Sequence, residues 1–458
     1  MRKPIAAILM LAIVATAYSN LTSCANGNTA ESNKDTTQSY EISYDLSFDI
    51  PEKYIDVAMT YIPTGKRQES VEFKLPVWAP GYYIIIDYPK DLTGFEAHDQ
   101  NGDALNWEKK GKNSWVVETA DTVHVRYRIF SDFRSVAECR VEENAAFVPG
   151  NGVFMHVAGD IDHPVSVGFE LPEKWSRIST SLENVDGRYE APDFDVLYDS
   201  PFLLGNQYVK QVEHGGHLYE FALETPQGFE ESPMAEDFLK AVDQAVEIFG
   251  ETAYDSYHLL LLGEGRGGLE HQSSQADYTA GHWDFEYLDE LMFLTHEYFH
   301  NYNVKAIRPL ELGPFDYDRE NFTTGLWFSE GITCYYESYL LMKAGIITFS
   351  RAVNSGRRWW NWNTNPISLF LNADSSLPER PSTSVPLMVS EPLSGVLSVP
   401  RIWSRVDLPA PDAPMMDTTS PLPTPKSMPL STWSEPKDLT MDFASMIMVR
   451  RCLVEFEY

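Results

Sequence analysis

The sequence predicts a multidomain α+β protein with an N-terminal all-β sandwich domain, a mixed α/β domain and a proline-rich irregular tail. Hydrophobic residues alternate in the first half of the chain, follow a helical period after about residue 230, and lose both patterns beyond about residue 355. The 458 residues suffice for several domains with hydrophobic cores. The expected segments are a signal peptide (1–23), a polar tether (24–39), the β domain (40–228), a partial α/β domain (229–355) and an aberrant or disordered tail (356–458).

The β domain is predicted from short alternating runs separated by Gly, Pro, Asn and Asp. Every second residue of 40–50 is apolar, which is typical of a half-buried strand, and residues 123–129 repeat the pattern. Similar runs continue to about Phe221. Several short strands of this kind favour a sandwich.

The α/β domain is predicted from a change of period. Apolar residues in 238–249 follow helical spacing, and Gly250 is a plausible stop. Residues 258–262 resemble a buried strand, and helices are expected at 288–302 and 326–342.

The first residues are typical of an export signal. Arg2 and Lys3 precede an apolar segment, 5–17, that is short for a transmembrane span. The following Leu-Thr-Ser-Cys resembles a bacterial lipobox, so we expect lipidation of Cys24 and a cell-envelope location, periplasmic or surface. An ordinary secretory signal with an incidental cysteine is the alternative. The net charge of −32 argues against nucleic acid as a partner.

The tail differs from the rest of the chain in composition. Between residues 357 and 458 the chain has fourteen of its 29 prolines and a single glycine, Gly395. A disordered extension is one interpretation. A frameshift or another departure from the natural continuation is the second, which the scattered apolar residues slightly favour.

The sequence His-Glu-Tyr-Phe-His at 296–300 carries the chemistry. On a helix, His296 and His300 lie one turn apart on one face, where both can bind one Zn²⁺ ion. Glu297 can then take a proton from a metal-bound water. The pattern alone is short enough to occur by chance, with two unconnected histidines.

Two further segments supply candidate site residues. Glu330, an acid in an apolar helical run, is a candidate third ligand, the alternative being a solvent-facing glutamate. Gly267 and Gly268 would let the backbone approach a substrate, with Glu270 and His271 as substrate-binding side chains. Cys334 is interpreted as a buried apolar residue.

Several blocks in order resemble the M61 glycyl aminopeptidase family of gluzincin-type metallopeptidases over roughly residues 40–350. These blocks are His296–His300 with Asn303-Val304-Lys305, Arg308-Pro309, Phe315-Asp316-Tyr317, Leu326-Trp327 with Glu330-Gly331, and Tyr335-Tyr336. Upstream, Leu75–Tyr83 and Asp199-Ser200-Pro201 resemble its β domain, and Gly268–His271 its exopeptidase motif.

The resemblance implies a partial thermolysin-like zinc peptidase catalytic domain at 229–355. It implies His296, His300 and Glu330 as zinc ligands, Glu297 as general base and Glu270 at the substrate amine. The expected function is a zinc-dependent aminopeptidase acting on peptides that begin with Gly or Ala. The alternatives are an impaired envelope protein that binds peptide or glycan through a vestigial zinc site, and a zinc endopeptidase.

The sequence departs from the family after about residue 350. The family continues with more helices, a tyrosine that supports the tetrahedral intermediate, and a PDZ-like domain. No tyrosine lies between Tyr339 and Tyr458, and proline-rich 357–430 does not resemble a PDZ domain. We therefore expect a truncated or aberrant C-terminal part and uncertain activity.

Overall fold

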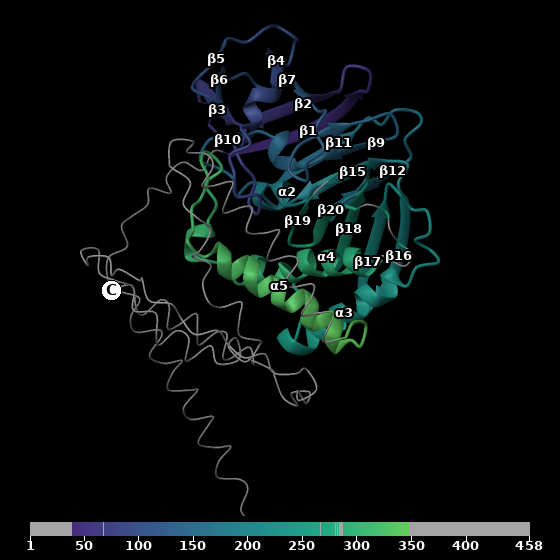
Figure 1. Ribbon diagram of the computed structural model, residues 1–458. Coiled ribbons are helices and arrows are strands. Elements are labelled where there is room, and N and C mark those ends of the chain that lie inside the picture. Colours follow the sequence, from purple (N-terminus) through teal and green to yellow (C-terminus); the bar gives the residue numbers. More distant parts are fainter. Residues whose placement is uncertain are drawn as a thin grey trace, which may run out of the picture.

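The computed structural model describes residues 39–348 and Arg351, apart from 67, 266, 280, 282 and 284–286. A β domain lies at one end, and a second domain, formed by one sheet and its helices, lies at the other (Figure 1). The expectations for the signal peptide, Cys24, the tether and the tail lie outside the described residues.

The first domain contains three sheets. The seven-stranded sheet has the order β13 (Glu183–Val185), β14 (Arg188–Ala191), β11 (Val165–Phe169), β1 (Tyr40–Asp49), β2 (Tyr54–Pro63), β7 (Val123–Phe130), β4 (Leu92–Asp99). The four-stranded sheets are β10 (His156–Val157), β3 (Ser70–Lys74), β6 (Ser114–Glu118), β5 (Trp107–Lys109), and β12 (Arg177–Ser179), β15 (Phe202–Gly205), β9 (Ala145–Val148), β8 (Arg140–Val141). Three short helices complete it: η1 (Tyr88–Asp91), η2 (Gly150–Gly152) and α2 (Phe194–Tyr198).

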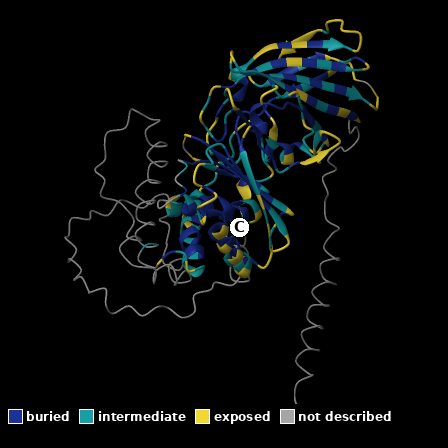
Figure 2. Ribbon diagram, turned by 90° about the vertical axis from the view of Figure 1, so that its right-hand side faces the viewer, coloured by how far each residue is buried: buried dark blue, intermediate teal, exposed yellow. Residues whose placement is uncertain are grey.

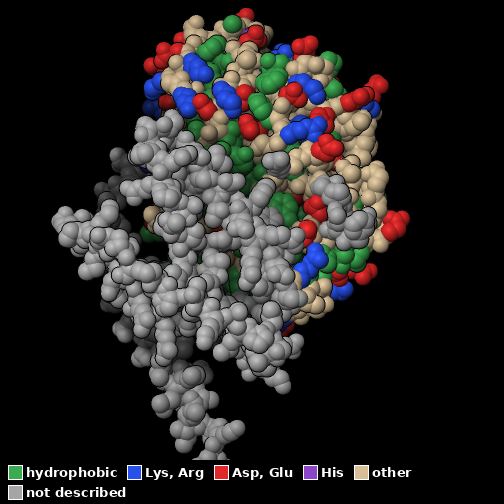
Figure 3. Space-filling model, in the orientation of Figure 1, with side chains coloured by type: hydrophobic (Ala, Val, Ile, Leu, Met, Phe, Trp, Pro, Cys, Tyr) green, Lys and Arg blue, Asp and Glu red, His purple; other side chains and the backbone are tan. Residues whose placement is uncertain are grey.

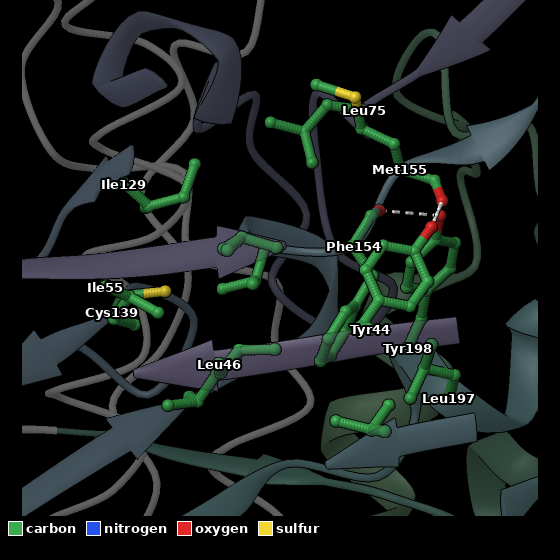
Figure 4. Close-up of a cluster of buried hydrophobic side chains, with 14 of the residues drawn as sticks. Tyr44, Leu46, Ile55, Leu75, Ile129, Cys139, Phe154, Met155, Leu197 and Tyr198 are labelled. Atoms are coloured by element: carbon green, nitrogen blue, oxygen red, sulfur yellow. Dashed lines mark hydrogen bonds between the residues drawn. The ribbon is translucent and has the colours of Figure 1, made fainter. Parts of the chain in front are cut away.

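The core of this domain follows from the alternation in the sequence. Inward residues of β1 and β7 are buried while their neighbours are more exposed, as the bands along the strands show (Figure 2). Two tyrosines of this core have paired hydroxyls: Tyr44 donates to the Met155 carbonyl, and Tyr198 donates to the Phe154 carbonyl at 3.1 Å (Figure 4). Apolar burial therefore holds the domain together without leaving these polar atoms unpaired.

The second domain is built on a five-stranded sheet. Its order is β16 (Tyr208–His214), β17 (His217–Leu223), β18 (Ser256–Leu262), β20 (Ser274–Tyr278), β19 (Gly268–Glu270). Its helices are α3 (Met234–Phe249), α4 (Tyr287–Phe299), the π-helical turn η3 (Asn301–Ala306), η4 (Leu310–Leu312) and α5 (Leu326–Lys343). Helix α4 contacts β19 and β20 on one side and α3 and α5 on another, so it is enclosed by the domain (Figure 1).

The multidomain α+β class is confirmed, but the sheets divide the chain earlier than expected. Strand β17 pairs in parallel with β18, so the hairpin of β16 and β17 belongs to the second sheet, although we placed a boundary at 228. The alternation of this hairpin resembles that of the preceding strands, and strand pairing is not encoded in alternation. The helix expected at 288–302 ends as α-helix at Phe299, because the backbone at Asn303 is non-helical.

Charges of both signs are interspersed on the face of the first domain seen in Figure 3. Ion pairs of this domain include Lys110 with Glu72 and Lys112 with Asp87. Among the described residues, no helix has the length and apolar content needed to cross a membrane.

Candidate metal centre and active site

The three predicted metal ligands meet at one point. His296 lies in the last turn of α4, His300 follows that turn, and Glu330 lies in the first turns of α5. The two Nε2 atoms are 3.1 Å apart, and Glu330 Oε2 is 3.4 Å from His296 Nε2 and 3.5 Å from His300 Nε2. A tetrahedral zinc ion with bonds of about 2.0–2.1 Å separates its ligand atoms by roughly 3.3 Å. The triangle therefore fits such an ion.

Both imidazoles are oriented through their other ring nitrogen. His296 Nδ1 is 2.8 Å from Oε2 of Glu337, a fully buried residue of α5. His300 Nδ1 is 2.8 Å from the carbonyl oxygen of Asn303. An N–H donated from each Nδ1 leaves Nε2 with a free lone pair toward the shared point.

The turn after α4 is fixed to α5 by side-chain hydrogen bonds. Asn303 Nδ2 donates to the Ser329 carbonyl at 2.9 Å and to Thr333 Oγ1 at 3.2 Å. The non-helical backbone at Asn303 thereby turns its own carbonyl toward His300. The Asn-Val-Lys block is thus part of the support for the second histidine.

The electrostatics of the centre favour a cation. Burial disfavours charge on His300, but the carboxylates of Glu330 and Glu270 outweigh burial and raise its pKa to about 9. Burial likewise raises the pKa of Glu330, but the two imidazoles outweigh it and lower this pKa well below its usual value. Carboxylates packed this closely around imidazoles create a negative potential that a divalent ion would neutralise.

Glu297 lies on the same turn as the ligands and packs against the glycine pair. A Cβ at Gly268 would lie 2.4 Å from Glu297 Oε1, so only glycine leaves room for this carboxylate. Burial raises the pKa of Glu297 to about 7, while His296 and His300 act in the opposite direction. A carboxylate with such a pKa suits proton transfer near neutral pH. Gly268 therefore makes room for the Glu297 carboxylate, whereas we expected it to let the backbone approach a substrate.

Glu270 lies at the end of β19, close to Glu297 and His300. A small pocket adjoins it, lined among others by Trp78, Gly81, Tyr83, Lys305 and Arg308. Gly81 has a left-handed backbone with φ +87°, and a Cβ there would lie 2.9 Å from Glu270 Oε1. The pocket that contains the expected amine-binding carboxylate is thus shared by both domains.

His271 lies outside this pocket lining and takes part in a contact between the domains. Its Nδ1 is 3.0 Å from Asp199 Oδ1, and Lys305 Nζ donates to the same oxygen at 2.7 Å. Burial would raise the pKa of Asp199, but Lys305 and His271 outweigh it and lower this pKa to about 2. The substrate-binding role predicted for His271 gains no support from this position.

No site role was predicted from the sequence for Glu337, Asp199 or Tyr83, although Asp199 and Tyr83 lie in segments that resemble the β domain of the family. Glu337 lies seven residues after Glu330, so it lies on the same face of α5, and this spacing is a usable signal. No local pattern pointed to Asp199 or Tyr83 as neighbours of the centre. Cys334, expected to be a buried apolar residue, is half-buried with Sγ 3.8 Å from His296 Nδ1.

Comparison with known families places these features in context. A model of the Peptidase M61 N-terminal domain matches residues 43–206, and a model of the M61 glycyl aminopeptidase matches residues 289–363. Together the two matches cover just over half of the chain. No functionally curated protein matches the sequence.

The fold is similar to that of a solved structure. An aminopeptidase N family protein from Idiomarina loihiensis aligns with a TM-score of 0.61 and 27% identity, over 68% of this chain and 56% of that chain. This chain therefore spans little more than half of that protein. An M1 zinc metallopeptidase from Deinococcus radiodurans aligns with a TM-score of 0.39 and 14% identity, over 76% of this chain and 77% of that chain.

The fold and the family matches together define the class, which is that of metal-dependent peptidases. Within this class the chain belongs to the M61 peptidase family, since both family models match it in the expected order.

Proposed function

We propose that this chain is a zinc-dependent aminopeptidase that removes small N-terminal residues, Gly or Ala, from peptides. The convergence of His296, His300 and Glu330 within 3.5 Å of one another carries the proposal. Glu297 and Glu270 lie beside this triangle, and their carboxylates extend the proposal from metal binding to peptide hydrolysis.

A zinc ion bound there would lower the pKa of a water molecule to about 7 and polarise the scissile carbonyl. Glu297 accepts a proton from the attacking water, whose oxygen forms a bond to the carbonyl carbon. Glu297 then returns this proton to the leaving nitrogen as the C–N bond breaks, which yields one carboxylic acid and one amine. The carboxylate of Glu270 holds the free α-ammonium of the substrate, which favours cleavage after the first residue.

The proposal is tested with Glu297→Gln, measured beside the wild-type chain for zinc content and for hydrolysis of alanine p-nitroanilide. Gln keeps the size of the side chain but cannot accept the proton, so we expect turnover to fall by about 10²–10⁴-fold with zinc retained. Glu264→Gln, on a loop outside the site, is the matched control and should behave as the wild type.

The same assays separate the alternatives. Wild-type protein that binds zinc and hydrolyses no peptide would select the binding protein with a vestigial site. Equal cleavage of N-acetylated and free peptides would select an endopeptidase, because an acetylated terminus cannot pair with Glu270. The lipid anchor at Cys24 and the envelope location stay predictions from sequence.

A further inference from the structure

The loop between β3 and η1 reaches the centre from the first domain. Its base is closed by a bridge between Trp78 and Ile85, and Val77 accepts hydrogen bonds from the backbone of Ile86 and Asp87. The loop thus has a defined shape before any contact with the second domain is considered.

Two hydrogen bonds fix this loop to the second domain. The Val77 N–H donates to the Tyr317 carbonyl at 2.9 Å, and Trp78 Nε1 donates to the Asp316 carbonyl at 2.7 Å. Trp78 is fully buried, which makes this attachment rigid. The loop is therefore held over the centre by the Phe-Asp-Tyr block that follows the metal helix.

The backbone of the loop is strained at an aromatic residue. Tyr83 has φ +57°, a left-handed conformation that L side chains rarely adopt. Such a conformation persists only where its surroundings enforce it, and strain of this kind gathers at functional sites. Here it accompanies a side chain that lines the pocket beside Glu270.

The Tyr83 hydroxyl lies in the field of the catalytic groups. Burial raises the pKa of its phenol well above the usual value, and three carboxylates raise it further: Glu270, Glu330 and Glu297. The hydroxyl therefore keeps its proton throughout the working pH range. Within the described part of the chain, no residue forms a hydrogen bond with it.

We propose that Tyr83, supplied by the β domain, is a further catalytic residue that donates its hydroxyl to the carbonyl oxygen of the scissile bond. The inference rests on the proposed function. The neighbouring groups at the centre are carboxylates and imidazoles with other roles, the Lys305 ammonium is already paired with Asp199, and the Arg308 guanidinium lies over the Phe315 ring. A neutral donor in the pocket beside Glu270 can bind an oxygen that gains negative charge during attack, and this bond strengthens as the charge develops.

The test compares Tyr83→Phe with Tyr82→Phe. The control removes a hydroxyl from the adjacent residue, which accepts from Ser135 Oγ at 3.3 Å outside the pocket lining. Loss of one such donor lowers kcat by about 10²–10³-fold. We expect this loss for Tyr83→Phe on alanine p-nitroanilide, with KM and zinc content unchanged, and none for Tyr82→Phe.

A binding measurement distinguishes a catalytic role of Tyr83 from a purely structural role. A phosphinic dipeptide, which mimics the tetrahedral state, should bind Tyr83→Phe more weakly by the same factor as kcat falls, while alanine binds equally well. Unchanged kcat, or equal losses for both ligands, overturns the assignment. If the wild type is active and Glu297→Gln is not, this failure concerns Tyr83 alone, whereas an inactive wild type overturns both proposals.

Discussion

The metal end and the substrate end of the site are built differently. The metal end takes His296, His300 and Glu330 from two helices of one domain that pack directly on each other. The substrate end takes Glu270 from an edge strand of the second domain and Gly81 and Tyr83 from a loop of the first. One end is local in sequence, and the other depends on how the domains meet.

The ligand positions and the pocket geometry therefore depend on different contacts. Ligand positions follow from helical spacing and from Nδ1 contacts within a rigid helix pair, so they persist as long as the second domain is folded. The pocket follows from contacts between the domains, among them the hydrogen bonds of Val77 and Trp78, so its geometry depends on how the domains meet. Changes at the two ends should therefore affect different measurements.

The largest effect is expected for Glu330→Gln at the metal end, because an amide is a poor zinc ligand and one of three ligands is lost. Zinc affinity, titrated against a competing chelator, should fall by well over 10²-fold. Glu337→Gln changes only the group that orients His296 and should cost about 10–100-fold.

Glu311→Gln, which changes an exposed glutamate of the short helix η4, is the control and should leave zinc affinity unchanged. A larger loss for Glu337→Gln than for Glu330→Gln would contradict the assignment of the third ligand.

A smaller effect is expected for Gly268→Ala, where the two ends meet. The added Cβ would displace the Glu297 carboxylate, since the atoms would be 2.4 Å apart. Zinc should stay bound while turnover falls by roughly 10²-fold, as expected when a general base is misplaced. Because both changes act on one group, Gly268→Ala should cost nothing further in a Glu297→Gln background. Additive losses would show that the glycine acts elsewhere.

The smallest effect on the chemistry is expected for Asp199→Asn at the domain contact. Its pKa of about 2 lies below the value of about 3.9 for a free aspartate, so its ionisation stabilises the folded protein above about pH 4. This stabilisation is lost as pH falls toward 2. Asp199→Asn should remove it, lowering the free energy of unfolding by about 2 kcal/mol at pH 7 and by little at pH 2.

Urea unfolding at both pH values measures this difference. Asp45→Asn, which breaks an exposed pair with Arg188, is the matched control and should cost less than about 1 kcal/mol at pH 7. Equal losses at pH 7 and pH 2 would argue against a charge-dependent contact at Asp199.

The convergence of the predicted ligands could be expected from the sequence, because helical period and ligand spacing are local. His296, Glu297 and His300 lie within about one helical turn, and Glu330 lies in an apolar run that forms a second helix, whereas the first helix ends at Phe299 and not at the expected residue 302. The contact of Asp199 with His271 spans 72 residues, and that of Trp78 with Asp316 spans 238. No hydrophobic period in the sequence encodes contacts between residues so far apart. The structure was therefore needed to show that both domains line the pocket and that the β16–β17 hairpin belongs to the second sheet.

That hairpin also determines where the chain can be divided. A fragment that begins after residue 228 would lack two of the five strands of the second sheet. Strand β18, with Leu259 to Leu262 almost completely buried, would then present an open, apolar edge. Exposed edges of this kind pair with other chains and aggregate. Recombinant fragments of the catalytic half should therefore start between β15 and β16, near residue 206.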